Sequence, residues 1–312
     1  MLAGRADADE VRRDGYRRLP VDDRRAAPDL AVEAGRTALE RAGLTADRLG
    51  LVAHAWIHHQ GHDFWSPAHY VASSLGARNA EPVGVQQMCN GGAAALRIAL
   101  DRMAADPGVE AALVTTADSF PAPGFERWRA DYGVAYGDGG TALLLTREHA
   151  RYRVAGLVTV AAPELELMHR GDDDFSPAPR QHGAALDVRR TKKAFLVRAG
   201  KEVFAETVDR SLRRAVTGAL EQARLGPNAT LPVALPRLGR SVLESAYLPA
   251  LAGLVEGEVL DFGPDTGHLG AGDAAASLAE ADARGLVPPG GHLLVISAGA
   301  GFTWTALVVQ AL

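Results

Sequence analysis

The stretch VGVQQMCNGGAAAL (83–96) decides how this 312-residue chain is expected to fold. It runs from apolar residues through Cys89 to Gly91 and Gly92 and then to small helix-forming residues. We expect a strand that ends just before the cysteine and a helix that begins just after it. A helix N-terminus stabilises a thiolate, and glycines let a substrate approach closely. In this context Cys89 is a candidate nucleophile, although a lone cysteine among alanines is more often a small buried hydrophobe.

Strands and helices alternate on both sides of this stretch. Short apolar runs predict strands, and apolar residues at helical spacing predict helices. Because helices separate most of the strands, we expect parallel βαβ units in an α/β protein. The order is similar on either side of residue 150, which suggests two related halves, 1–150 and 151–312. The expected strands are 49–56, 81–86, 110–118, 140–147, 152–161, 231–235, 292–298 and 302–310, and the expected helices are 28–43, 66–77, 91–105, about 200–223, 240–252 and 273–284.

Local signals set some of these boundaries. Asp29 is the expected N-cap of the first helix and Gly43 its expected stop, while Ser66 is the expected N-cap of the second helix. Residues 163–192 are polar and irregular, and they indicate a solvated loop more than a binding loop.

Composition and missing motifs exclude several classes of protein. The formal net charge of −5 argues against a nucleic-acid binder, and the single cysteine excludes an intrachain disulfide. Residues 1–20 lack the apolar core of a signal peptide, and no run of about 18 apolar residues occurs. The His58, His59, His62 and Asp63 cluster matches no standard metal-ligand spacing, and nucleotide-binding and serine-hydrolase motifs are absent. We expect a cytoplasmic protein without a metal or bound cofactor, and one that does not bind membranes.

Four motifs in one order carry a family resemblance. They are the cysteine stretch, GDGGTALLL (137–145), DTGHLGAGDAAASLAEA (265–281) and PPGGHLLVISAGAGFTWTALVV (288–309). Together they resemble ketoacyl-acyl-carrier-protein synthase III and its relatives, from about residue 28 to the last residue. The resemblance implies a thiolase-like αβαβα five-layer fold of two pseudo-duplicated halves, a homodimer and an active-site cysteine. The relatives open with a strand and a glycine-rich turn, which raises the hypothesis that this chain's start is truncated or misannotated.

The chain departs from that family at both partners of the cysteine. The synthases carry Pro-His-Gln-Ala-Asn where this chain has 234–238, so Leu235 stands in the place of the histidine. They carry Gly-Asn where this chain has Gly267 and His268. Condensation by decarboxylation needs hydrogen-bond donors on the developing enolate, and losing one costs on the order of 10²–10³ in rate. Ketosynthase chemistry is therefore disfavoured.

A thiol and an imidazole are instead sufficient for acyl transfer. Cys89 would take the acyl group, and His268 would deprotonate an alcohol, amine or thiol. Asp273 could orient the imidazole or only cap the next helix, and Asp265 is a weaker candidate. A similar replacement occurs in a synthase-like subfamily that moves acyl groups onto sugars, cyclitols or carrier proteins in antibiotic biosynthesis. The segment WIHHQGHDFWSPAHY (56–70) also resembles that subfamily.

The resemblance implies further site residues. The amides of Cys89 and Ala300 would form the oxyanion hole. The donor would be an acyl-carrier-protein or coenzyme A thioester. The implied acyl pocket is formed by Trp56, His59, Phe64, Trp65 and Leu235, although its aromatic residues could instead be core residues. Electrostatic attraction makes basic residues candidates for docking an acidic carrier, although a basic run is more often a solvated face; the candidates are Arg198, Lys201 and Arg237.

Two alternatives to acyl transfer stay open. One is a condensing synthase with rearranged partners, which would release carbon dioxide from a malonyl thioester. The other is a catalytically idle subunit that pairs with an active synthase. The acyl group and the acceptor, whether a sugar, a cyclitol or a second carrier, stay open as well.

Overall fold

The computed structural model describes residues 7–148, 150–178, 183 and 185–312. In the first half it confirms each predicted helix and strand to within a few residues, and it adds one short helix at the start. The elements are α1 (Ala8–Asp14), α2 (Ala27–Ala42), β1 (Leu49–Ala55), α3 (Pro67–Leu75), β2 (Glu81–Val85), α4 (Gly91–Ala105), β3 (Ala111–Asp118) and β4 (Gly139–Thr146).

The second half agrees less closely with the predicted pattern. The prediction of a loop over 163–192 is wrong near both ends, because α5 lies near its start and α6 begins before its end. Asp187 caps α6 by accepting a hydrogen bond from the Arg190 amide at 3.0 Å. The elements are β5 (Tyr152–Ala161), α5 (Leu167–Arg170), α6 (Val188–Ala199), α7 (Lys201–Gln222), β6 (Ala229–Thr230), β7 (Val233–Ala234), α8 (Arg240–Val242), α9 (Leu248–Leu251), β8 (Val255–Glu256), β9 (Val259–Leu260), α10 (Asp273–Ala283), β10 (His292–Gly299) and β11 (Thr303–Ala311).

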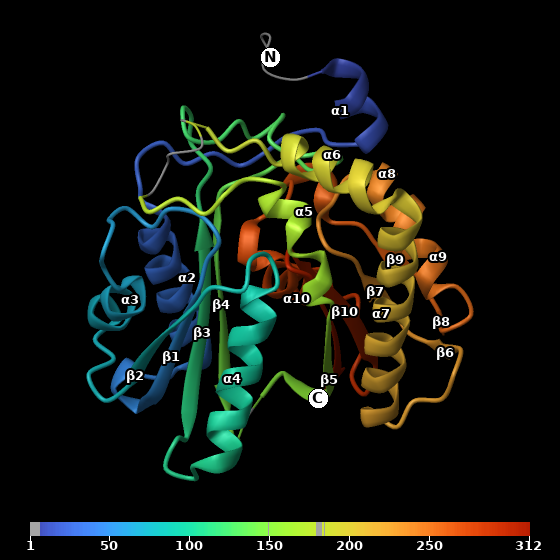
Figure 1. Cartoon of the computed structure of the whole chain (residues 1–312). Helices are drawn as coiled ribbons and strands as arrows, with labels where there is room; N and C mark the ends of the chain where they lie inside the picture. Colours follow the sequence, from blue (N-terminus) through green and yellow to red (C-terminus); the bar gives the residue numbers. More distant parts are fainter. Residues whose placement is uncertain (1–6, 149, 179–182, 184) are drawn as a thin grey trace.

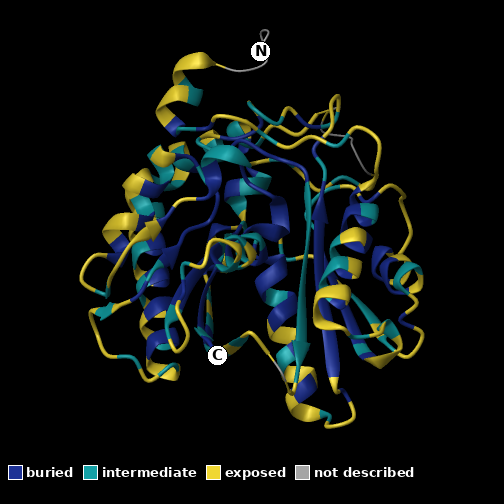
Figure 2. Ribbon diagram, turned by 180° about the vertical axis from the view of Figure 1, so that it is seen from behind, coloured by how far each residue is buried: buried dark blue, intermediate teal, exposed yellow. Residues whose placement is uncertain are grey.

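The elements stack in five layers (Figure 1). Helices α2 and α3 cover the outer face of the first sheet, and α7 covers the outer face of the second. Helices α4 and α10 lie between the sheets and contact each other. The central strands β1, β3, β10 and β11 are largely buried, whereas the edge strands are partly exposed and the outer helices expose one face (Figure 2). The predicted αβαβα architecture is therefore confirmed.

Both sheets mix parallel and antiparallel strands. The first has the order β2-β1-β3-β4, with β4 antiparallel to β3. The second has the order β5-β11-β10-β7-β9, with β11 antiparallel to both of its neighbours. The expected parallel units do not extend to β4, which is antiparallel to β3 because no helix lies between them, and β11 returns antiparallel to β10 through a tight turn.

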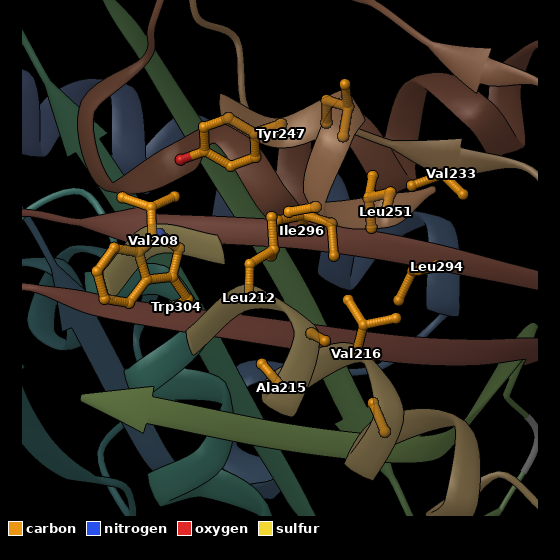
Figure 3. Close-up of a cluster of buried hydrophobic side chains, with 14 of the residues drawn as sticks. Val208, Leu212, Ala215, Val216, Val233, Tyr247, Leu251, Leu294, Ile296 and Trp304 are labelled. Carbon is orange, nitrogen blue, oxygen red and sulfur yellow. The ribbon is translucent and has the colours of Figure 1, made fainter. Parts of the chain in front are cut away.

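The core of the second half fixes one loop of the site. Side chains of α7 pack on β10 and β11, which the turn 300–302 joins (Figure 3). Because these side chains are buried and closely packed, the strands hold that turn in a fixed position. The labelled members of this core include Val208, Leu212 and Val216 of α7, Leu294 and Ile296 of β10, and Trp304 of β11.

Two predicted caps differ from the structure. Helix α2 begins at Ala27, so Asp29 lies in its first turn and accepts a hydrogen bond from the Tyr70 hydroxyl at 2.5 Å. Ser66 occupies the N-cap position of α3, but its hydroxyl contacts His69 Nδ1 at 2.8 Å and caps no backbone amide. Gly43 ends α2 in the left-handed conformation, as predicted.

The buried His54 of β1 predicts a loss of stability in acid. Its Nδ1 lies 3.0 Å from Thr115 Oγ1 and its Nε2 lies 3.2 Å from Gln60 Oε1. Burial lowers the pKa of His54 from 6.5 to about 4, despite the hydrogen bond to Gln60. Between these values the unfolded chain binds a proton that the folded chain does not, so the free energy of unfolding falls as the pH drops through this window.

We expect this one group to remove about 3 kcal/mol of stability between pH 6.5 and pH 4. Burial also lowers the pKa of His169 to about 4, so His54→Gln should reduce the pH dependence and not abolish it. Urea denaturation across this pH range measures how steeply the free energy of unfolding changes with pH, and substitution of the exposed His62 by glutamine is the control. Equal slopes for His54→Gln and the native chain would show that His54 protonates equally in both states.

No helix among the described residues is both long enough and apolar enough to span a bilayer.

Candidate active site

Cys89 lies in the turn between β2 and α4, as the sequence predicts. Val85 ends the strand, Met88 adopts a positive φ of 48°, and Gly91 begins the helix. A Cβ atom on Gly92 would overlap the carbonyl oxygen of Ala271, which follows His268 in the chain. Gly92 therefore allows the His268 segment from the second half to approach the first turn of α4.

His268 and Asp273 form a buried pair. His268 is only 3% exposed, and its Nδ1 lies 2.7 Å from Asp273 Oδ2. Because the carboxylate can only accept, His268 Nδ1–H donates, which leaves Nε2 available for the thiol. Asp273 Oδ1 accepts from the Leu269 amide and Oδ2 also accepts from the Arg237 amide, each at 2.8 Å. The amides of Leu269 and Arg237 thus hold the Asp273 carboxylate in place beside His268.

The alternative carboxylate does not contact the imidazole. Asp265 accepts a hydrogen bond from Arg17 Nε at 2.9 Å near the surface, and Arg18 lies 3.7 Å from it. Asp273 is therefore the carboxylate that the structure places on His268.

Electrostatics favour the charged imidazole. Burial lowers the pKa of His268, but the charges of Asp273 and Cys89, with a hydrogen bond to each, outweigh it and raise the pKa well above 6.5. Burial likewise raises the pKa of Asp273, but His268 and then Arg237 outweigh it, so the pKa lies below its usual value. The arrangement suits a thiolate–imidazolium–carboxylate array.

The turn between β10 and β11 packs against the cysteine. A Cβ atom on Gly299 would overlap the Asn90 amide nitrogen and lie 3.0 Å from the Gln87 carbonyl oxygen. Ala300, the implied second oxyanion donor, is the next residue. The structure therefore brings together the two segments whose amides would stabilise a tetrahedral oxyanion.

Asp118 is a buried site residue that the sequence analysis missed. Its Oδ1 accepts from the amides of Ile57 and His58 at 2.9 and 2.8 Å, and its Oδ2 accepts from the Ala271 amide at 3.0 Å. Burial raises the pKa of Asp118 to about 7, although these hydrogen bonds oppose the shift. Asp118 thereby ties the segment after β1 to the segment that carries His268. An aspartate at the end of a buried strand, where active-site loops begin, is the signal that could have indicated it.

Four of the five implied pocket residues line one cleft. The cleft has a volume of about 1290 Å³ and is lined by Trp56, His59, Phe64 and Trp65. It also reaches Gln86, three residues before Cys89, although Cys89 is not among its lining residues. The fifth residue, Leu235, is buried in the core of the second half and does not line the cleft.

Arg237 was predicted to dock a carrier, and that prediction is wrong. It is only 1% exposed, and its guanidinium donates to Glu280 Oε2 at 2.9 Å, the Phe262 carbonyl at 3.0 Å and Thr266 Oγ1 at 2.7 Å. A buried and paired guanidinium cannot contact a protein at the surface. Its backbone amide instead supports Asp273.

The other two predicted docking residues lie at the surface. Arg198 forms an ion pair with Asp172 at 3.1 Å, and Lys201 is exposed at the start of α7. Within the described ranges, no group of three or more histidine, cysteine or acidic side chains is arranged to hold a metal ion.

Known proteins share this sequence and architecture. Residues 228–311 match the family described as 3-oxoacyl-[acyl-carrier-protein (ACP)] synthase III C terminal. The chain is 28% identical to a β-ketoacyl-[acyl-carrier-protein] synthase III of Pectobacterium atrosepticum, over 94% of this chain and 89% of the relative. It is 27% identical to the same enzyme of Caldanaerobacter subterraneus, over 93% and 85%.

Solved structures extend the comparison. The structure of ChlB3, an acyltransferase, superposes with a TM-score of 0.91 and 31% identity, over 99% of this chain and 91% of that one. A 3-oxoacyl-[acyl-carrier-protein] synthase III from Aquifex aeolicus superposes with a TM-score of 0.76 and 21% identity, over 97% and 91%. By sequence and by fold, the chain is related to the synthase III enzymes and has their thiolase-like fold.

Proposed function

We propose that this protein is an acyltransferase that carries an acyl group on Cys89 and passes it to a hydroxyl, amine or thiol without decarboxylation. The observation that carries the proposal is the 2.7 Å contact between His268 Nδ1 and Asp273, which leaves the other imidazole nitrogen available for the nearby Cys89 thiol. The 31% identity to ChlB3, an acyltransferase, supports it. From the family resemblance we propose a carrier-protein or coenzyme A thioester as donor, and antibiotic biosynthesis as the context.

The first half-reaction loads the cysteine. The Cys89 thiolate attacks the thioester carbonyl, and the amides of Cys89 and Ala300 stabilise the oxyanion. The intermediate collapses with cleavage of the carbon–sulfur bond to the donor. The departing thiolate takes the proton of the His268 imidazolium, so the step leaves an acyl-cysteine, a neutral imidazole and a free donor thiol.

The second half-reaction transfers the acyl group from Cys89 to the acceptor. The neutral His268 removes the proton of the acceptor nucleophile as that group attacks the acyl-cysteine. Cys89 leaves as a thiolate, and the thiolate–imidazolium pair is restored. Asp273 stays ionised and stabilises the imidazolium without taking its proton. In the complete reaction the acyl group moves from the donor thiol to the acceptor, and one proton moves from the acceptor to the donor thiol.

Condensation is the second candidate, because the curated relatives are named as synthases. In this chain, however, Leu235 occupies the position of the synthase histidine and is buried in an apolar core. It offers no donor to an enolate oxygen, and the remaining imidazole is committed to Asp273 through Nδ1. These contacts favour transfer to a heteroatom.

A two-stage experiment distinguishes the candidates. Acyl thioesters on coenzyme A and on a carrier protein are screened for loading by intact-protein mass, and the loaded protein is then chased with sugars, cyclitols and a second carrier. We expect a mass increment that one of these nucleophiles discharges, with no carbon dioxide from a malonyl thioester. Malonyl-dependent carbon dioxide release with a ketoacyl product would replace the proposal by condensation. A Cys89 that neither loads nor reacts with iodoacetamide at neutral pH would replace it by an idle subunit.

The assembly and the location are also proposals. From the family resemblance we propose a homodimer, and β2 is an edge strand of the first sheet that a second copy could extend. We further propose that the protein acts in the cytoplasm, where its single cysteine stays reduced.

Docking of an acidic carrier predicts a selective effect at Lys201. Lys201→Glu should raise the KM for a carrier-borne donor about three- to tenfold, because it replaces attraction by repulsion at the edge of the interface. Turnover of a small thioester should not change. Steady-state kinetics with both donors measure the ratio, with Arg41→Glu on the exposed face of α2 as the charge-matched control. An equal rise in KM for both donors would show that the carrier does not dock at Lys201.

A further inference from the structure

The ring of Tyr136 lies against the catalytic imidazole. The ring centroids of Tyr136 and His268 are 5.3 Å apart with an interplanar angle of 63°, an edge-to-face contact. The backbones of the two residues also run side by side. The His268 amide donates to the Ala135 carbonyl at 2.8 Å, and the Gly137 amide donates to the His268 carbonyl at 3.0 Å. Tyr136 is therefore fixed relative to His268 by both backbone and ring.

The hydroxyl of Tyr136 is anchored to a buried carboxylate. It donates to Asp131 Oδ2 at 3.2 Å, and Lys192 Nζ donates to both oxygens of Asp131 at 2.6 and 2.8 Å. Asp131 is only 3% exposed, and its Oδ1 also accepts from the Tyr132 amide at 2.7 Å. A buried carboxylate with this many donors has little freedom to move, so the hydroxyl is held at a defined point.

Lys192 belongs to α6, whose first turn is bound to the same segment. The Val188 amide donates to the Ala130 carbonyl at 2.9 Å, and Arg189 Nε donates to the Asp131 carbonyl at 2.9 Å. Helix α6, the Asp131 carboxylate and the Tyr136 ring thus form one connected unit that ends on His268.

We propose that Tyr136 is a positioning residue for His268, and that the Asp131–Lys192 pair anchors it to α6. Asp273 fixes only one edge of the imidazole, through Nδ1, and a single hydrogen bond leaves the ring free to tilt about that contact. A rigid aromatic wall removes this freedom and keeps Nε2 directed at Cys89. The inference rests on the proposed acyl transfer for its kinetic consequence, but the geometry of the Cys89–His268 pair can be measured without it.

The aromatic neighbours of Tyr136 make its ring and its hydroxyl separable. The ring packs on Phe120 and Phe125 at centroid distances of 4.9 and 4.8 Å. Tyr136→Phe therefore keeps the wall and removes only the anchor, whereas Tyr136→Leu removes the wall. Lys192→Met removes the same anchor from the other end, and the exposed neighbour Lys193→Met is its matched control.

The test measures two quantities on each variant: the chase rate of the loaded enzyme and the pH profile of Cys89 alkylation by iodoacetamide. The groups that set the profile around His268 are Cys89, Asp273 and Asp118. We expect the chase to slow about tenfold in Tyr136→Phe and about 100-fold in Tyr136→Leu, where the alkylation profile also moves to higher pH. Lys193→Met should match the native chain.

A double-mutant cycle tests the anchor itself. If the hydroxyl and the lysine act through one path, Lys192→Met slows the chase about tenfold alone and adds little in the Tyr136→Phe background. If the effects of Tyr136→Phe and Lys192→Met on the chase rate are additive, Lys192 does not anchor the Tyr136 hydroxyl. A native alkylation profile and chase rate in folded Tyr136→Leu would overturn the positioning role. If the native chain is never loaded, the proposed function fails, whereas unchanged alkylation in all variants counts against this inference alone.

Discussion

Replacing Cys89 with alanine should abolish the acyl mass increment and reduce transfer by at least about 10⁴-fold. In the proposed mechanism the Cys89 thiolate holds the acyl chain, and the chain has no second cysteine that could replace it. His268 and the amides at 89 and 300 would remain, but without a nucleophile they can only polarise a bound thioester. The residual rate is therefore that of direct attack by the acceptor, which lacks the advantage of two easier steps.

Intact-protein mass spectrometry and a timed chase measure both effects. The neighbouring sulfur provides the control, because Met88 is also partly exposed and also follows β2. Met88→Leu should load and discharge as the native chain does. A mass increment that survives in Cys89→Ala would place the acyl group on another residue, and transfer at the native rate without any increment would mean direct transfer in a ternary complex.

The sequence predicts those parts of the fold and site that depend on local pattern. The strand–Cys89–glycine arrangement, the Gly43 stop and the five-layer architecture follow from periodicity, small residues and the family resemblance. Gly92 and Gly299 occur where a Cβ atom would overlap another segment, so their place in the motifs has a steric cause that the structure explains.

What the sequence misses depends on contacts between distant segments. The sequence predicts that Arg237 is a surface cation, because arginine is rarely buried. In the structure its guanidinium is enclosed by residues that lie 25 to 43 positions later in the chain, namely Phe262, Thr266 and Glu280. Tyr136 gives no local sign of its role either, since its two partners, Asp131 and His268, lie on opposite sides of it in the chain. Only the packing of α6 and the His268 segment onto residues 130–137 reveals the arrangement.

Strand direction is missed for a related reason. The apolar run of β4 looks like that of a parallel strand, because α2 covers one face of this edge strand. Its direction follows from what precedes it. The connection 119–138 carries the Phe120, Phe125 and Tyr136 cluster in place of a crossover helix.

Replacing His268 with asparagine, the residue that the resembling synthases carry, should separate the two half-reactions. Without the imidazolium, no cation beside the sulfur stabilises the thiolate, and a free cysteine is only a few per cent thiolate at pH 7, so we expect loading to slow about 30-fold. Transfer should fall about 10³- to 10⁴-fold, because no base remains to deprotonate the acceptor. Asparagine can still donate to Asp273, so the fold should persist.

The pH dependence of this variant decides the role of the imidazole. A higher pH favours the thiolate of any cysteine, so loading of His268→Asn should recover most of its rate at pH 9, whereas transfer to an alcohol should not. The variant should gain no condensing activity, because Leu235 still fills the position of the second partner. Stopped-flow loading and a separate chase at both pH values measure the two steps. Equal recovery of loading and transfer at pH 9 would mean that His268 only stabilises the thiolate, and that another group accepts the proton of the nucleophile.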